Sequence, residues 1–154
     1  MSNAATSASA IVLSPVPWGD GDPFWEAAAR GELVMQRCPD TGRLLFPPTP
    51  LSPFGDHRQP EWVSVSGAGR IWSFIVPHPP LIAQFADLRP FPVAVVELDE
   101  DPGARLVGPV VSGPGAPLDS VDPQTLSIGQ RVVVDLTSSS GEGLVLPRWI
   151  PRTD

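Results

Sequence analysis

The stretch that decides the fold is EWVSVSGAGRIWSFIV, residues 61–76. Side chains within residues 62–66 and 71–76 alternate with a period of two. This is typical of β-strands, because successive side chains point to opposite faces. Gly67 and Gly69 interrupt the alternation where a strongly curved strand has to bend. The stretch therefore predicts strands near Trp62–Ser66 and Gly69–Val76 with a bend between them.

Further strands are predicted downstream, at Pro92–Leu98, Arg105–Val111, Gln130–Leu136 and Leu144–Trp149. The apolar run Val93–Val96 is continuous, as in a strand that is buried on both faces. Residues 122–126 predict one helical turn, and Gly129 leads from it into the next strand. Short curved strands with an interposed helical turn predict a small closed or nearly closed barrel.

A short helix is predicted upstream of the strands. Asp22 is a suitable N-cap, Pro23 suits the first helical position, and Gly31 is a natural terminator. A helix of two turns is marginal in water by itself, so it has to dock through its aromatic residues Phe24 and Trp25. These two side chains either pack on the helix's own domain or anchor it in a partner's groove.

A hairpin-like unit follows the helix. Leu33–Arg37 and Arg43–Phe46 have strand character, and Cys38–Gly42 between them predicts a tight turn. A proline-rich crossing over residues 47–50 leads to a second loop, Ser52–His57. This unit and the helix make up the predicted N-terminal region.

Composition excludes several classes of protein. The 21 prolines and 14 glycines exclude a mainly helical chain, because proline lacks a backbone donor. A net charge of −7 with scattered arginines opposes nucleic-acid binding, which needs a cationic face. The single cysteine excludes an internal disulfide and a four-cysteine zinc site. We expect no membrane span and no signal peptide, and hence a cytoplasmic protein with a flexible arm over residues 1–21.

Several motifs in order resemble one family. They are DPFWEAAARGELVMQRCPDTGRLLFPPTPLSP (residues 22–53), EWVSVSGAGRIWSFIVPH (61–78), FPVAVVELDE (91–100), IGQRVVVDL (128–136) and LPRWIP (146–151). Together they are similar to the domain of unknown function 35 family. The resemblance implies a mainly β chain with a short N-terminal helix, a rubredoxin-like zinc ribbon and a C-terminal OB-fold. The implied domains are the helix and ribbon over residues 22–60 and the OB-fold over residues 61–151.

The resemblance also implies a function. Members of this family are bound to thiolase-superfamily enzymes that act on acyl-CoA thioesters, and the chemistry belongs to the partner. We therefore expect a non-catalytic accessory subunit of a thiolase or of a lipid-transfer-protein-like retro-aldolase, with steroid side-chain degradation as the favoured setting. We expect the acyl-CoA substrate to be shared with the partner and no cofactor to be held. The alternatives are a stand-alone acyl-CoA-binding OB-fold and, less favoured, a single-stranded nucleic-acid binder.

The family's zinc ribbon is degenerate in this sequence. Its four ligand positions fall on Cys38, Thr41, Ser52 and Gly55, so three of the four are not cysteine. Hydroxyl groups are poor zinc ligands and glycine has no side chain. We predict a ribbon without metal, stabilised instead by Leu44, Leu45, Phe46, Phe54 and the neighbouring prolines. A mixed metal site at Cys38, Asp40, Asp56 and His57 is the less favoured alternative.

The remaining candidates concern binding. Trp72 and Phe74 are predicted on one face of a strand, as barrel core, as a base-stacking platform or as a channel wall for an acyl chain. With Phe24, Trp25, Phe46 and His78 they are the interface or channel candidates. Arg70 and Arg89 are candidates for CoA phosphates, which arginine binds through a bidentate fork, and Arg105 and Arg148 are weaker ones. Without a Gly-x-Ser-x-Gly elbow or a reactive-cysteine motif, we expect no catalytic residue.

Overall fold

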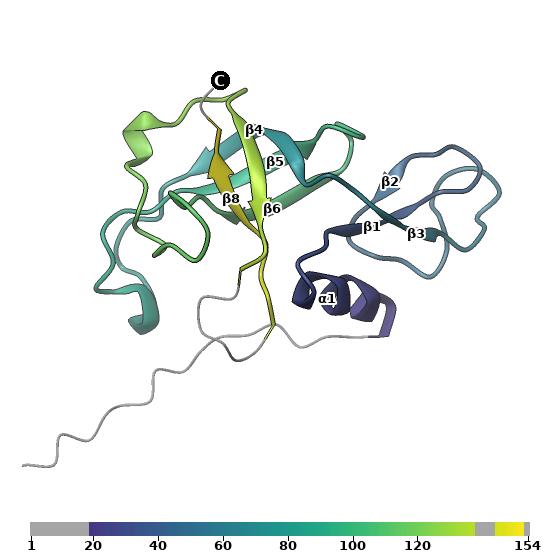
Figure 1. Ribbon diagram of the computed structural model, residues 1–154, viewed down its shortest axis with the longest axis horizontal. Coiled ribbons are helices and arrows are strands. Elements are labelled where there is room, and N and C mark those ends of the chain that lie inside the picture. The colour runs from purple at the N-terminus through teal and green to yellow at the C-terminus, as the bar shows by residue number, and fades with distance from the viewer. Residues whose placement is uncertain (1–18, 138–143, 153–154) are drawn as a thin grey trace, which may run out of the picture.

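The computed structural model describes residues 19–137 and 144–152 (Figure 1). Residues 1–18 of the predicted arm lie outside this range, and Gly19–Gly21 form the 3₁₀ helix η1. The other elements are α1 (Asp22–Ala29), β1 (Val34–Arg37), β2 (Leu44–Leu45), β3 (Glu61–Ser64), β4 (Ala68–Ile75), η2 (Ala83–Phe85), β5 (Val93–Leu98), β6 (Arg105–Pro109), η3 (Pro123–Thr125), β7 (Arg131–Asp135) and β8 (Arg148–Pro151). No described helix has the length and the apolar character that crossing a bilayer requires.

Helix α1 begins at Asp22, as predicted, but Asp22 is not its N-cap. Gly21 is the N-cap, and Asp22 lies in the first turn without a capping hydrogen bond. The carboxylate there still favours the helix, because it lies near the positive end of the dipole. The end of the helix is as predicted. The Arg30 amide donates to the Ala27 carbonyl, and Gly31 follows with φ of 80°.

The first sheet has the strand order β2-β1-β3, with antiparallel pairing throughout. The strand predicted near Trp62–Ser66 is present as β3, but it pairs with β1 and belongs to the first sheet rather than to the barrel. Gly67 explains the separation. Its φ is 71°, and a Cβ there would lie 2.3 Å from Cγ1 of Val134. The chain turns at this glycine, passes close to β7, and enters the second sheet as β4.

The second sheet has the order β6-β5-β4-β7-β8 and closes on itself. A parallel bridge joins Val110, just after β6, to Trp149 of β8, and the Val111 amide donates to the Trp149 carbonyl at 2.8 Å. A five-stranded closed barrel of this kind is an OB-fold.

The last strand begins at Arg148, later than predicted. Burial along β5 alternates, so Val93–Val96 is not equally buried on both faces.

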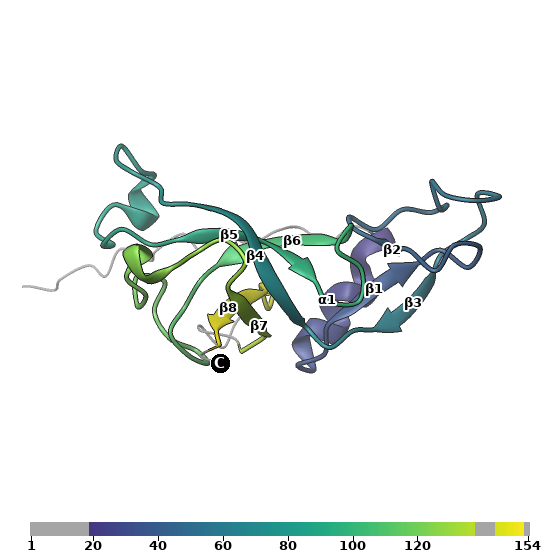
Figure 2. The same cartoon turned by 90° about the horizontal axis from the view of Figure 1, so that it is seen from above.

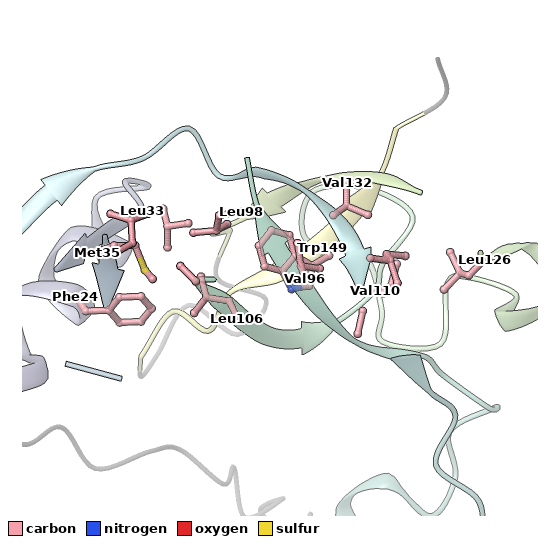
Figure 3. Packing of buried hydrophobic residues seen from close by; sticks show 14 of the residues in the cluster. Phe24, Leu33, Met35, Val96, Leu98, Leu106, Val110, Leu126, Val132 and Trp149 are labelled. Carbon is pink, nitrogen blue, oxygen red and sulfur yellow. The ribbon is translucent and has the colours of Figure 1, made fainter. Parts of the chain in front are cut away.

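A single hydrophobic core joins the two sheets (Figure 3). Phe24, Leu33 and Met35 from the helix and ribbon belong to the same buried cluster as Leu98 and Leu106 from the barrel. Further barrel residues of the same cluster are Ile71, Val96, Val110, Val132 and Trp149. Helix and ribbon are thus part of the barrel's core rather than a separately packed appendage.

Candidate partner-binding surface

A β-bulge in β4 places Trp72 outside the barrel. Ile71 pairs with Val96 and Ser73 with Val95, so Trp72 is the extra residue between two successive pairs. An extra residue reverses the alternation that follows it. Ile71 is buried and Trp72 is 48% exposed, whereas Phe74 packs against the core. The prediction that Trp72 and Phe74 share one face is therefore wrong, because the two-residue period of side-chain orientation is interrupted at the bulge.

The Trp72 ring lies against Arg105, which belongs to a row of charged side chains. The Arg105 guanidinium lies 3.9 Å from the ring centroid. Its Nε and Nη2 also donate to Oε1 of Glu97, at 3.2 and 2.8 Å. Arg70 is the register partner of Glu97 on the other side, and its Nη1 donates to the Gly129 carbonyl at 3.1 Å. The side chains of Arg70, Glu97 and Arg105 thus form a row across β4, β5 and β6. The row lies beside the Trp72 indole, which Arg105 holds in place.

Apolar side chains continue the same face. Val95 is the register partner of Val107, and Val93 pairs with Ile75. Val107 is 61% exposed and Ile75 is 64% exposed, while the two β5 valines are half-buried. Contiguous exposed apolar residues on a sheet mark interaction surfaces more reliably than scattered ones do. We call this surface the outer-sheet patch, and its members are Trp72, Ile75, Val93, Val95 and Val107.

A long loop extends from the end of the patch. Residues 76–92 join β4 to β5 and contain the short helix η2. The loop leaves the barrel at the end opposite α1 and the ribbon (Figure 2). Its base is tied down by the Phe85 and Phe91 rings, whose centroids are 5.8 Å apart, and by Arg89, whose Nε lies 3.7 Å from Asp119 Oδ2. His78 is exposed at the start of this loop, next to the patch in sequence.

The aromatic candidates of the helix and ribbon form a separate group. Phe24 is buried in the core. Trp25 meets it edge to face with centroids 5.0 Å apart, and Phe46 packs against it at 5.5 Å while remaining 40% exposed. The packing role considered for Phe24 is therefore the observed one. Trp25 and Phe46 partly cover it and stay interface candidates.

The arginine candidates differ in their surroundings. Arg148 is buried and pairs with Asp135 at 2.5 Å, so it is not available to a phosphate. Arg89 and Arg105 are engaged with acidic partners. Within the described residues Arg70 is exposed and forms no ion pair. Arg70 is therefore the better placed of the two phosphate candidates.

A shallow cleft lies between the start of the helix and the ribbon. Its volume is about 240 Å³, and its lining includes Asp20, Gln36, Thr49, Gln59 and Trp62. Pockets that enclose drug-sized ligands usually measure roughly 300–1,000 Å³ and are mostly apolar. This cleft is smaller and more polar than a site for a CoA thioester would be.

The former ligand positions of the ribbon lie close together. The Cys38 thiol is buried and donates to the Phe54 carbonyl at 3.5 Å, and the Ser52 hydroxyl donates to the same carbonyl at 3.1 Å. Burial raises the pKa of Cys38, but hydrogen bonds from Ser52 and Thr41 outweigh it and lower the pKa to about 7. The mixed set of Cys38, Asp40, Asp56 and His57 is not brought together. Among the described residues no three His, Cys, Asp or Glu side chains lie close enough to hold a metal ion.

The comparisons with known proteins agree with this architecture. Residues 62–137 match the family model of the ChsH2 C-terminal OB-fold domain, and residues 25–51 match that of the ChsH2 rubredoxin-like zinc ribbon domain. A solved structure titled "Ltp2-ChsH2(DUF35) aldolase" superposes with a TM-score of 0.67 at 32% identity, covering 89% of this chain and 98% of that one. The chain belongs to the DUF35 family. A DUF35 domain-containing scaffold protein of Methanothermobacter thermautotrophicus is 31% identical over 74% of this chain and 78% of its own length.

Some relatives of this DUF35 protein are longer. The 3-oxo-4,17-pregnadiene-20-carboxyl-CoA hydratase alpha subunit of Mycobacterium tuberculosis is 36% identical over 71% of this chain. The chain spans about a third of the length of the hydratase alpha subunits that it matches. The likeness to these subunits thus concerns the region that they share with this chain.

The donor set of this ribbon does not fit the zinc that the family model implies. Zinc ribbons hold the ion through four thiolate or imidazole groups. Here one thiol faces two hydroxyl-bearing residues and a glycine, and the hydroxyl of Ser52 is already used in hydrogen bonds to Phe54. The four ligand positions of this ribbon therefore do not provide the donors of a structural zinc site.

Sequence reasoning missed the exposed valine and isoleucine of the patch. The glycine beside Val107 becomes a usable signal only with the structure, in which Gly108 packs against Trp149. A Cβ at Gly108 would lie 2.4 Å from the Pro147 carbonyl oxygen and 3.2 Å from Nε1 of Trp149. A glycine that faces the core places its neighbours on the outer face. Ile75 carries no such signal, because its orientation depends on the bulge at Trp72.

Proposed function

We propose that this chain is a non-catalytic, cytoplasmic accessory subunit of a thiolase-superfamily enzyme that acts on acyl-CoA thioesters. We further propose that the outer-sheet patch is the surface that binds the enzyme subunit. The observation that carries the proposal is the patch itself, an ordered apolar face with a tryptophan that Arg105 holds in place. OB-folds bind their ligands on the face of their second and third strands, which correspond here to β5 and β6.

The composition of the patch suits a protein partner. Trp72, Ile75 and Val107 are half to two-thirds exposed, so covering them would contribute on the order of 3–5 kcal/mol. Tryptophan and arginine are the residues most enriched among those that dominate binding energy. Because Arg105 already holds the Trp72 ring, little side-chain freedom is lost when a partner covers it.

The charged row beside the patch would determine the orientation of the bound partner more than the affinity of the complex. Arg70 and Arg105 flank the single carboxylate of Glu97, which leaves one positive charge in excess on this edge of an acidic protein. An acidic rim on the partner would complement that charge. A nucleic-acid strand is a poorer match, because the net charge of −7 opposes its approach.

The names of the relatives support the substrate class. One solved relative is titled as an aldolase with a ChsH2(DUF35) component, and one sequence relative is named as a hydratase subunit for a steroid-derived CoA thioester. We propose a retro-aldolase of steroid side-chain degradation as the partner. In this arrangement Arg70, which is free of ion pairs among the described residues, would meet the phosphates of the CoA.

The test is co-expression with a lipid-transfer-protein-like aldolase from the same genome, followed by size-exclusion chromatography with light scattering. We expect a heteromer that cleaves a CoA thioester and an isolated chain that does not. Val107→Asp should abolish the heteromer without unfolding the chain, because Val107 is exposed. Leu51→Asp is the matched control, because Leu51 is also exposed but lies in the ribbon.

Two outcomes would contradict the proposal. If Val107→Asp co-elutes with the enzyme as the unchanged chain does, the patch is not the docking surface. If the unchanged chain never forms a heteromer yet binds an acyl-CoA by calorimetry, the stand-alone binding module replaces the accessory subunit.

A further inference from the structure

The two loops of the ribbon are each closed by their own backbone. In the first knuckle, residues 38–43, the Cys38 amide donates to the Arg43 carbonyl and the Gly42 amide donates to the Cys38 carbonyl, both at 2.9 Å. In the second knuckle, residues 52–58, the Ser52 amide donates to the Arg58 carbonyl at 2.9 Å. The turns that would present metal ligands are therefore preserved although three of the ligands are not.

The side chain of Asp40 fastens the two knuckles together. Its Oδ2 accepts a hydrogen bond from the Asp56 amide at 3.0 Å, and its Oδ1 pairs with the Arg58 guanidinium. The hydrogen bond from Arg58 is the main reason why the pKa of Asp40 lies below its ordinary value, and the Asp56 amide adds to it. One carboxylate of the first knuckle thus holds both an amide and a cation of the second.

Asp40 also occupies the space that a fourth ligand would need. A Cβ built on Gly55 would lie 2.6 Å from Cβ of Asp40 and 2.7 Å from its Oδ2. These distances are shorter than side chains tolerate, so Asp40 and a cysteine at position 55 exclude each other in this geometry. Gly55 is therefore required by the carboxylate and is not merely a lost ligand.

Two further contacts join the same parts of the ribbon. The Cys38 thiol donates to the Phe54 carbonyl, and the Arg43 guanidinium lies 4.1 Å from the centroid of the Phe54 ring. On the barrel side the Leu44 amide donates to Oδ2 of Asp101 at 2.9 Å. Each contact crosses from one segment to another, which is the role that a structural zinc ion has in a ribbon.

We infer that this ribbon is a metal-independent module, in which the contact of Asp40 with Arg58 and the Asp56 amide replaces the metal ion as the link between the knuckles. We call this contact the Asp40 clasp. The inference does not depend on the proposed function, since it concerns how the ribbon is held and not what the chain binds. It also accounts for a glycine at position 55, where any side chain would meet Asp40.

The first experiment measures metal dependence on the full chain. Zinc content by mass spectrometry should be far below one ion per chain, and neither EDTA nor equimolar Zn²⁺ should shift the melting temperature. Structural zinc sites are coupled to folding strongly enough that chelators unfold the modules that hold them. One zinc ion per chain together with destabilisation by EDTA would overturn the inference.

The second experiment removes the negative charge from the clasp. Asp40→Asn should speed hydrogen exchange at the amides of residues 52–58 by roughly two- to five-fold, the range expected from an exposed ion pair. Glu61→Gln is the matched control, because it removes an exposed ion pair with Arg37 from the same sheet at 3.3 Å without touching the knuckles. Equal exchange in the two variants would show that Asp40 does not fasten the second knuckle.

The third experiment tests whether the Asp40 side chain opposes zinc binding in addition to the absence of three cysteines. The variant with Thr41→Cys, Ser52→Cys and Gly55→Cys has four cysteines but keeps Asp40, and a fourth substitution, Asp40→Gly, clears the space. The four-substitution variant should bind one zinc ion, and the three-substitution variant should bind it at least tenfold more weakly. Equal zinc affinity in the two would refute the claim that Asp40 occupies the ligand's place.

Discussion

The buried ion pair between Asp135 and Arg148 should dominate the stability of the barrel's closing strands. Oδ2 of Asp135 accepts hydrogen bonds from Arg148 Nη2 at 2.5 Å and from the Gly115 amide at 3.2 Å, while Oδ1 accepts one from the Thr137 amide at 2.9 Å. Arg148 donates further to the Ala116 carbonyl at 2.9 Å. The pair thus joins β7, β8 and the loop before η3, with both side chains about 95% inaccessible to solvent.

The substitution Asp135→Asn keeps the shape of the side chain and removes its charge. Arg148 then remains buried without a counter-ion, which costs about 3–5 kcal/mol. Domains of this size are stable by only about 5–15 kcal/mol, so the loss is a large fraction of the total. The expected fall in melting temperature is roughly 6–20 °C. Urea unfolding followed by tryptophan fluorescence measures the loss of unfolding free energy, because Trp149 follows Arg148 in β8, and a thermal melt measures the fall in melting temperature.

The neighbouring pair of Asp99 and Arg131 supplies the control. It is bidentate, at 3.0 and 2.8 Å, but both side chains are about one-third exposed. Asp99→Asn should therefore cost at most about 1 kcal/mol. The double variant with Asp135→Asn and Arg148→Met should recover much of the loss, since no buried charge is left unpaired. If Asp135→Asn costs no more than Asp99→Asn does, the reasoning about the buried pair is refuted.

Two further predictions concern the same region. Burial raises the pKa of Asp135, but hydrogen bonds from Thr137 and Gly115 and the charge of Arg148 outweigh it, so the pKa lies below its ordinary value. Its stabilisation is complete above about pH 4 and is lost as the pH falls below that value. The stability difference between the unchanged chain and Asp135→Asn should thus shrink from pH 7 to pH 3, and a constant difference would contradict this sign. Gly108→Ala should destabilise the barrel by about 1–3 kcal/mol, because its Cβ would meet the Pro147 carbonyl oxygen at 2.4 Å. Gly113→Ala, which has open space around it, should be neutral in the same thermal melt.

Local signals in the sequence predicted most of the fold. Pro23 and Gly31 mark the two ends of the helix, because proline restricts φ to a helical value and glycine tolerates the positive φ that ends the helix. The turn at residues 123–125 was predicted in the same way, and Asp122 accepts a hydrogen bond from the Gln124 amide there. Such features depend on a few neighbouring residues, so a single sequence contains the information.

The features that the sequence could not predict depend on distant partners. The bulge at Trp72 exists only because β5 is paired beside it, and the bulge determines which aromatic residue faces outward. The assignment of β3 to the ribbon depends in the same way on its pairing with β1. Asp40 and Arg58 are eighteen positions apart, and neither has a local signal of its contact. Candidate sites built from such pairs require the structure.

The shared core offers a physical reason why the ribbon persists without three of its cysteines. In an isolated zinc ribbon the metal supplies most of the folding free energy, because the module is too small to bury a core. Here Met35 and Leu44 of the ribbon and Phe24 of the helix lie in one buried cluster with Leu98 and Leu106 of the barrel. Burying each of these side chains contributes about 1.5–3 kcal/mol. The ribbon's strands are therefore held by the barrel, and only the two knuckles, which lie beyond that core, need a link of their own. The carboxylate of Asp40, with the Asp56 amide and the Arg58 guanidinium, is sufficient to link the two knuckles. A chain that is free of zinc and keeps its melting temperature in EDTA would confirm this.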